Sequence, residues 1–296
     1  MNANLLGQYL VQGLMSGVLY ALMALGITFI YSIMKMINWA MGQFYMIGSF
    51  VQYLLIVYVF GVRYWWLALP LSAAVVFVIG WLLEPLLIKP MFDKDIGRKD
   101  EYATVVTIAL FLLLTGLATL FGGPHLRNPG TSVPNVQIGP LPVSGANFAA
   151  FAGALVAIAI FNLVIRRTWT GLALRSAAQS RIAVQTAGID VLKLDAVAFG
   201  IGVALAAIAG ALLAPVYLVY PTNGTIVTTK GFEIIIIGGL GSIPGTLVAG
   251  VLLGLVEALG SALISSNYQN VYGFALLIVV LLLRPQGLFG ERARVA

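Results

Sequence analysis

The chain of 296 residues contains no cysteine and only one histidine, His125. Without cysteine, neither disulfide bonds nor thiolate metal sites can form. Charge is also scarce: 9% of the residues are charged and 60% are hydrophobic, whereas about a quarter of a typical soluble domain is charged. This composition excludes a protein whose surface mostly faces water. It offers no cluster of His, Cys or carboxylate side chains for catalysis or for binding a metal, so we expect neither.

The few charges are clustered, and long charge-free runs lie between them. Each run reaches the roughly 20 residues that a helix needs to cross the hydrocarbon core of a membrane. The runs cover residues 1–34, 36–62, 64–83, 102–126, 128–165, 196–229, 234–256 and 258–283. The sequence therefore predicts an all-α integral membrane protein, a polytopic bundle of about eight apolar helical segments that forms a single transmembrane domain over residues 1–296.

The placement of positive charge predicts which segments face the cytoplasm, because Lys and Arg concentrate on that side. Residues 166–193 carry five basic side chains and one acidic one, and the tail from Arg284 carries three basic and one acidic. Both are predicted to be cytoplasmic. Five prolines between residues 122 and 147 predict a loop, and its single charge, Arg127, favours the external side. Because the basic residues adjoin apolar runs, the net charge of +6 indicates membrane topology and not binding to nucleic acid.

A simple count of helices conflicts with this topology. If the loop at 89–101 is inside, three spans, predicted near 102–122, 148–165 and 196–219, leave the chain outside at Pro221. Two further crossings would then put the basic tail outside. The conflict is resolved if residues 231–264 enter the membrane and return, turning within the GGLGSIPG stretch at 238–245. Backbone freed from helical hydrogen bonds at membrane depth needs protein or water around it, so this turn is predicted to line a cavity.

A second interruption, near residues 38–43, suggests an internal repeat with one broken segment in each half. Broken helices of this kind mark substrate routes in transporters. The translocation route is therefore predicted to be lined by small and polar residues of both segments, although tight helix packing would explain each glycine equally well. The predicted residues are Asn38, Trp39, Gly42, Gln43, Gly239, Gly241, Ser242 and Gly245. Two further stripes of small residues, at 13–28 and 250–261, favour close helix packing within the chain over a subunit interface.

Residues 167–193 form the predicted cytoplasmic coupling loop. The stretch 171–190 is too polar to span a membrane, is rich in helix-forming residues, and ends at Gly188, which suits a left-handed helix cap. One amphipathic helix is predicted from Arg175 to Ala187. Its apolar face is mostly alanine and has no aromatic anchor, so docking onto a protein is favoured over resting on lipid. The predicted contact residues are Gly171, Leu174, Arg175, Ala178, Gln179, Ile182 and Gly188.

This stretch resembles the coupling loop of ABC-importer permeases, in the form found in LivH-type members of the branched-chain amino-acid permease family. Three more segments resemble motifs of the same family, in family order. They are INWAMG at 37–42 for the family's INFAHG, GF at 231–232 with GGLGSIPG at 238–245, and LRPQGLFG at 283–290. The resemblance covers essentially the whole chain. Trp39 and Met41 replace the family's Phe and His, so the family's ligand preference does not carry over at these positions.

The resemblance implies a permease subunit of an ATP-driven importer for branched-chain or related amino acids, small amides, urea or organic acids. It implies a LivM-like second permease, two cytoplasmic ATPase subunits and an external solute-binding protein, in a bacterial inner membrane. The chain itself contains no G-x-x-x-x-G-K-[ST] phosphate loop, so ATP and Mg²⁺ would be used by the partners. No cofactor and no enzymatic activity are expected of this chain.

Two other kinds of transporter remain as alternatives. A secondary transporter driven by an ion gradient normally carries ionisable groups within its spans. Glu257 is the one acid deep in an apolar run, and it could take part in gating or simply hydrogen-bond a neighbouring helix. A channel is the third possibility, but a channel has no evident need for the alanine-rich coupling loop.

Overall fold

The computed structural model describes residues 3–93, 97–130, 132–138 and 141–290, and almost all of its regular structure is helical. The principal helices are α1 (Ala3–Met34), α2 (Met41–Leu55), α3 (Trp65–Leu87), α4 (Pro90–Asp93), α5 (Lys99–Gly122), α6 (Gly145–Arg167), α7 (Trp169–Gln179), α8 (Arg181–Thr186), α9 (Val191–Tyr217), α10 (Asn223–Gly238), α11 (Ile243–Leu263) and α12 (Gln269–Leu283). Short turns of other helix types are η1 (Ile56–Phe60), η2 (Val62–Tyr64) and η3 (Ser266–Tyr268). Within the proline-rich loop, strands β1 (Val136–Ile138) and β2 (Leu141–Val143) form an antiparallel hairpin, which the sequence did not predict.

Eight helical stretches of the described chain are long and apolar enough to cross a membrane. Each predicted apolar run contributes to one of them, and the prediction of an all-α membrane bundle is confirmed. The 16-residue helix α10 is not among the eight. It is short, and it carries the charged residues Lys230 and Glu233.

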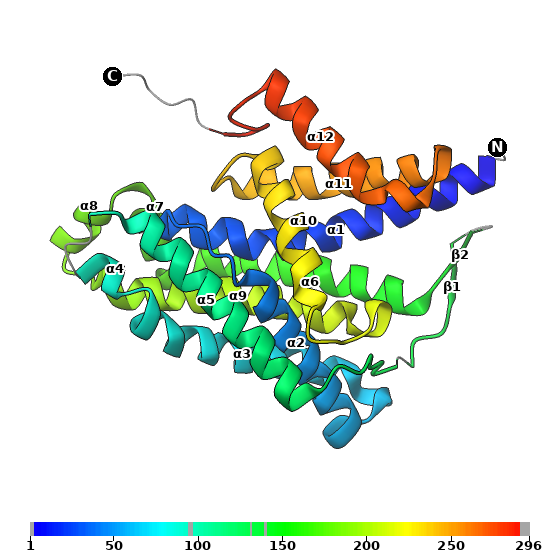
Figure 1. Ribbon diagram of the computed structural model, residues 1–296, viewed down its shortest axis with the longest axis horizontal. Coiled ribbons are helices and arrows are strands. Elements are labelled where there is room, and N and C mark those ends of the chain that lie inside the picture. Colours follow the sequence, from blue (N-terminus) through cyan, green and yellow to red (C-terminus); the bar gives the residue numbers. More distant parts are fainter. Residues whose placement is uncertain (1–2, 94–96, 131, 139–140, 291–296) are drawn as a thin grey trace.

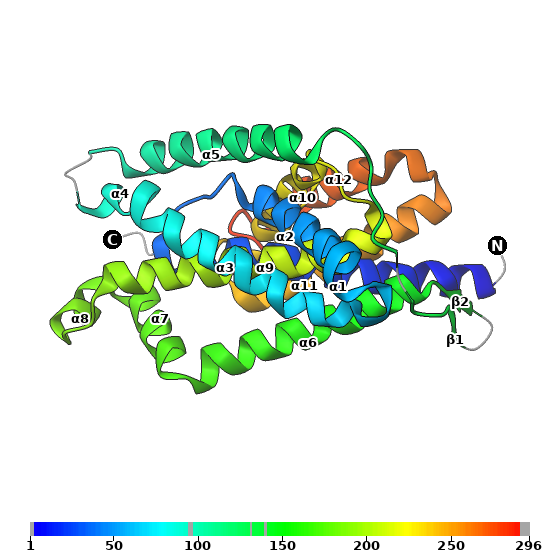
Figure 2. The ribbon, with the colours of Figure 1, turned by 90° about the horizontal axis from the view of Figure 1, so that it is seen from below.

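Figures 1 and 2 show two opposite ends along the long axis of the bundle. Helices α4, α7 and α8 lie together at one end, which we call the α7 end, and strands β1 and β2 lie at the other, the hairpin end. The loops predicted to be cytoplasmic are thus on the side opposite to the proline-rich loop, as their charges indicated.

Helices α1 and α9 form the centre of the bundle, and in each 83% of the most apolar window is buried. α1 packs closely along α11 through the two stripes of small residues. A Cβ on Gly13 would lie 2.7 Å from the Cβ of Ala258, and one on Gly17 would lie 2.7 Å from the Cα of Val251. Thr28 and Thr246 share a hydrogen bond of 2.6 Å farther along the same contact. The prediction that these stripes pack within the chain is confirmed.

The two halves of the bundle form an inverted repeat. Two non-glycine residues of the described chain have a positive φ, Lys35 (54°) and Leu218 (64°), and each ends one of the two central helices. A short helix then follows in each half, α2 after α1 and α10 after α9. The contacts correspond as well: α1 packs on α10 and α11, α9 packs on α2 and α3, and α2 crosses α10. Because α1 starts at the hairpin end and α9 starts at the α7 end, the halves have opposite orientation (Figure 1).

The predicted repeat is therefore present, but the sequence paired the wrong segments. The counterpart of the break at 35–40 is the break at 218–222, and not the glycine-rich turn at 238–245. The many glycines of the turn predicted a break there, whereas at the second break it is a leucine, Leu218, that adopts the left-handed conformation.

The predicted hairpin after Pro221 is also present. α10 and α11 are its two arms, and residues 239–242 form the turn between them. Figure 1 shows α10 running across the direction of α1 and α11. Since α11 and α12 are both long enough to span, the chain after Pro221 runs to the α7 end, back, and to the α7 end again. That path resolves the conflict in the helix count.

Candidate functional site

The two short helices α2 and α10 cross where the two breaks meet, at Gly42 and Gly224. A Cβ on either glycine would overlap the backbone oxygen of the other. The N–H of Gly42 also donates a hydrogen bond of 3.1 Å to Thr228 Oγ1 on α10. Gly42, predicted to line the route, is therefore a contact at which the two halves of the repeat touch.

Replacing Gly42 with Leu should force α2 and α10 apart. Overpacking of this kind costs about 1–3 kcal/mol, so we expect a clearly lower midpoint of thermal unfolding in detergent. Gly116→Leu on α5 is the matched control, because a Cβ there meets nothing within 4 Å. Equal midpoints for the two variants would contradict the assigned contact.

The other residues predicted at the first break surround this crossing. Asn38 and Gln43 are buried, and the Nδ2 of Asn38 and both amide atoms of Gln43 have no hydrogen-bond partner. Trp39 is 39% exposed and packs on Phe232 of α10, with ring centroids 4.7 Å apart. Buried amides without partners are uncommon in native proteins, and here they lie beside the junction of the repeats.

The residues predicted at the second segment lie in the α10–α11 turn, at the α7 end. Ser242 caps α11 by accepting a hydrogen bond of 3.2 Å from Gly245 N, and Gly245 packs against the end of α10. Gly239 and Gly241 have φ of +100° and +82°, a conformation that favours glycine. The structure thus does not bring the two predicted groups together: one lies at the α2–α10 crossing and the other at the end of the bundle.

The C-terminal motif LRPQGLFG completes this turn. Leu288 N donates to Ile237 O at 2.8 Å, and Phe289 N donates to Gly238 O at 3.0 Å. These bonds satisfy carbonyl groups that the end of a helix otherwise leaves unpaired. Two motifs that begin at residues 238 and 283 of the sequence therefore form one structural unit.

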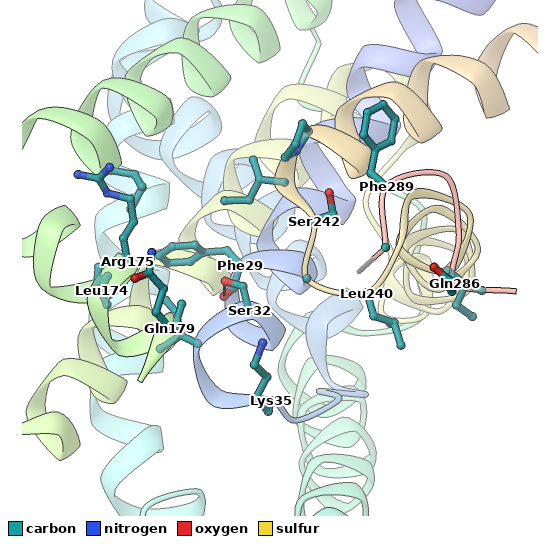
Figure 3. Close-up of a pocket in the computed structure, with 18 of the residues that line it drawn as sticks. Phe29, Ser32, Lys35, Leu174, Arg175, Gln179, Leu240, Ser242, Gln286 and Phe289 are labelled. Atoms are coloured by element: carbon teal, nitrogen blue, oxygen red, sulfur yellow. Dashed lines mark hydrogen bonds between the residues drawn. The ribbon is translucent and has the colours of Figure 1, made fainter. Parts of the chain in front are cut away.

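A cavity of about 890 Å³ lies beside this unit at the α7 end. Its walls come from the end of α1, from α7, from the α10–α11 turn and from the C-terminal segment (Figure 3). Labelled polar residues around it include Ser32, Lys35, Arg175, Gln179 and Ser242. The prediction that the turn lines a cavity is confirmed, and four residues of the predicted coupling loop share that cavity: Leu174, Arg175, Ala178 and Gln179.

The coupling loop contains two helices, and the prediction of one continuous helix from Arg175 to Ala187 is wrong. Ser180 is extended (φ −155°, ψ 108°) and separates α7 from α8, and its side chain caps α8. Serine readily takes this role, because its hydroxyl accepts a hydrogen bond from the next helix's free N–H. Gly188 has the predicted left-handed conformation, with φ of +82°.

The predicted contact residues fall on different sides of this element. Leu174 is buried, Gly171 packs against the end of α6, and Ala178 is half-buried. The other predicted residues are exposed: Arg175, Gln179, Ile182 and Gly188. α7 starts earlier than predicted, at Trp169, whose side chain is 84% exposed. The expectation that the helix lacks an aromatic anchor is therefore wrong.

Arg181 ties the coupling element to the centre of the bundle, a contact that the sequence did not predict. Its guanidinium makes a two-pronged ion pair with Asp195 of α9, with Nη1 3.2 Å from Oδ1, and lies 4.2 Å from the ring centroid of Phe92. Asp195 is fully buried. The sequence did contain an indication of this pair. Asp195 stands next to a long apolar run, and Arg181 lies 14 residues before it. Nearby, hydrogen bonds from Lys193 lower the pKa of Asp190, which caps α9.

Glu257 lies at the centre of a buried polar cluster. Its carboxylate pairs with Lys230 of α10 and accepts hydrogen bonds from Tyr20 of α1 (3.1 Å) and Gln269 of α12 (3.0 Å). Glu233 Oε2 lies 3.6 Å from Lys230 Nζ. The cluster therefore joins four helices, α1, α10, α11 and α12. No group of three or more His, Cys, Asp or Glu side chains in the described part of the chain could hold a metal ion.

Comparison with known proteins decides the family. Residues 9–283 match the family described as the permease component of the branched-chain amino acid transport system. The chain belongs to this family. The permease is 32% identical to the "High-affinity branched-chain amino acid transport system permease protein LivH" of Escherichia coli K12, over 96% of this chain and 95% of the relative.

Two further relatives have similar names. BraD of Pseudomonas aeruginosa, also named as a high-affinity branched-chain amino acid permease protein, is 32% identical over 96% of this chain and 95% of its own length. A probable LivH of Methanocaldococcus jannaschii is 28% identical over 92% of this chain and 89% of its own length. No solved structure matches the permease.

Proposed function

We propose that this permease is one of two membrane subunits of an ATP-driven importer for branched-chain or related amino acids, small amides, urea or organic acids. Its partners would be a LivM-like permease, two ATPase subunits that use ATP and Mg²⁺, and a solute-binding protein on the other side. The whole chain, 1–296, would act as one permease domain. The α7 end would face the cytoplasm and the hairpin end the exterior of the inner (plasma) membrane, since basic residues concentrate near the former.

The observation that carries this proposal is the construction of α7 and α8. The element is exposed away from the cavity lining at Trp169 and Leu172 of α7 and at Ile182 of α8. Leu174, Arg175, Ala178 and Gln179 of α7 line the cavity at the α7 end, and Arg181 ties the element to the central helix α9. An element built in this way can bind an ATPase on its outer side and transmit the ATPase's movement to the spans and to the cavity.

Reconstitution into liposomes tests the proposal. With both permeases, the ATPases and the binding protein present, uptake of L-leucine should require ATP inside the liposome. Omitting the ATPases should abolish uptake. Transport by this chain alone, or uptake that continues without ATP, would refute the proposal.

An ion-coupled mechanism is the alternative, and Glu257 is the acid on which it would depend. Its ion pair with Lys230 and its hydrogen bonds to Tyr20 and Gln269 support a structural role. The Glu257→Gln variant should therefore show the same response of uptake to a proton gradient as the native protein. Uptake that becomes insensitive to the gradient in this variant would revive the alternative.

A further inference from the structure

A second cavity, of about 300 Å³, lies beside the break between α9 and α10. We call it the tyrosine cavity, after four of the residues that line it. Its lining comes from α1, α2, α9, the 218–222 break, α10 and α12. The residues are Tyr20, Met23, Tyr45, Tyr217, Tyr220, Asn223, Ile226, Val227, Lys230, Gln269 and Asn270. The cavity is of a size that suits one small solute, and it combines polar groups with an apolar wall.

One polar group in this lining lacks a partner. Asn223 is 7% exposed, and its Oδ1 is buried without a hydrogen bond. The orientation of the amide is fixed by Ser49, whose hydroxyl donates to Met46 O at 2.7 Å and therefore accepts from Asn223 Nδ2 at 3.1 Å. The oxygen is left as a free acceptor. A buried acceptor without a donor is costly, and a ligand that carries N–H groups would satisfy it.

The charges nearby favour a cationic group over an anion at this acceptor. Lys230 is the cation in the lining, but its charge is already matched by Glu257, and Glu233 is a second carboxylate 3.6 Å from its ammonium. No surplus positive charge therefore remains in this cluster. A carboxylate has a different partner: the start of α10, which no side chain caps. The N–H groups of Asn223 and Thr225 donate there to Tyr220 O and Thr222 O, which leaves those of Gly224 and Ile226 for an anion. Such a helix start attracts anions.

We infer that the tyrosine cavity binds a zwitterionic α-amino acid with an aliphatic side chain during transport. The ammonium group lies toward Asn223 Oδ1, the carboxylate lies toward the start of α10, and the side chain packs against Met23, Ile226 and Val227. This inference rests on the proposed function, because it names the substrate class and its position in this subunit. None of the residues that the sequence predicted for the translocation route or the coupling contact lines this cavity, although Glu257 pairs with Lys230 of its lining.

The absence of cysteine from the chain permits a direct test. Ile226→Cys places a thiol in the cavity wall, and Val271→Cys on α12 is the matched control outside it, since the native side chains are 57% and 56% exposed. The assembled transporter in proteoliposomes is treated with a membrane-impermeant thiol reagent, and modification is read from the mass of this chain. L-leucine should slow modification of Ile226→Cys and leave Val271→Cys unchanged.

Two analogues test the recognition of both charged groups. 4-Methylpentanoate lacks the ammonium group of leucine and 3-methylbutylamine lacks the carboxylate, so neither should protect the thiol at concentrations where L-leucine does. Adding Asn223→Leu to Ile226→Cys should raise the leucine concentration needed for protection about tenfold, the effect of losing a hydrogen bond to a charged group. If that double variant does not assemble, the analogues with native Asn223 still decide.

The outcomes separate this inference from the proposed function. ATP-driven leucine uptake without protection of Ile226→Cys, or a thiol there that the reagent never reaches, would overturn the inference alone. Equal protection by either analogue would overturn the recognition of a zwitterion. A complete transporter that takes up no amino acid with ATP would overturn the proposed function itself.

Discussion

Glu257→Leu should strongly destabilise the permease. The substitution leaves the ammonium of Lys230, 5% exposed, with only Glu233 at 3.6 Å, and it removes the acceptor used by Tyr20 and Gln269. Removing one partner of a buried ion pair costs about 3–5 kcal/mol. We expect a large fall in the midpoint of thermal unfolding in detergent and little assembled transporter in the membrane.

The control for this prediction is an exposed ion pair. Glu101→Leu breaks the ion pair between Glu101 and Arg98. The side chain of Arg98 is 80% exposed and that of Glu101 is 66% exposed, and exposed pairs contribute only about 0–1 kcal/mol to stability. Glu257→Leu combined with Lys230→Met and Glu233→Gln should recover much of the loss, because neither an unpaired cation nor the Glu233 carboxylate, 3% exposed, then remains buried. A Glu257→Leu protein as stable as Glu101→Leu would show that the cluster does not hold the four helices together.

The second large effect is expected for Arg181→Ala, which detaches α8 from α9. If α7 and α8 transmit the movement of an ATPase, the assembled transporter should still hydrolyse ATP but should import at least about tenfold less leucine per ATP. The reason is that losing a hydrogen-bonded pair of charges costs more than about 1.4 kcal/mol, the free energy that corresponds to a factor of ten. Uptake and ATP hydrolysis measured on the same proteoliposomes give this ratio.

Two further variants separate coupling from stability. Arg181→Ala alone leaves the buried Asp195 carboxylate unpaired, so the double variant Arg181→Ala/Asp195→Asn should regain stability and remain uncoupled. Lys193→Ala is the matched control, because its pair with Asp190 spans 3.3 Å at the surface and its side chain is 86% exposed. If Arg181→Ala imports as much leucine per ATP as Lys193→Ala, the link through Asp195 does not carry the movement.

The inverted repeat relates the two cavities to the two helix breaks. Lys35, at the end of α1, lines the cavity at the α7 end, and Tyr220, in the break after α9, lines the tyrosine cavity. Gly42 and Gly224 touch between them. This arrangement offers one chamber near each end of the bundle, and a movement at the α2–α10 crossing would affect both, as alternating access requires.

The buried cluster around Glu257 adjoins the tyrosine cavity. Lys230 and Gln269 belong both to the cluster and to the lining of the tyrosine cavity. Helices α10 and α11, which the ion pair joins, meet again at the turn that lines the other cavity. A solute in the tyrosine cavity would therefore touch groups that hold the α10–α11 hairpin together.

The sequence by itself determined the class of protein and the position of most spans. Apolar length sets where a helix can cross, and the clustering of Arg and Lys sets which loops share an end, so α5, α6 and α9 appeared within a few residues of their predicted bounds. Local backbone chemistry also sufficed for the glycine-rich turn and for the left-handed cap at Gly188.

Only the tertiary structure decided which segments meet. The break at Leu218 has no glycine to reveal it, the kink at Ser180 depends on α8 being held by Asp195, and Glu257 acquires its partners from three other helices. The tyrosine cavity is assembled from residues between 20 and 270. Such contacts join residues far apart in the chain, and neither periodicity nor spacing along the sequence contains that information.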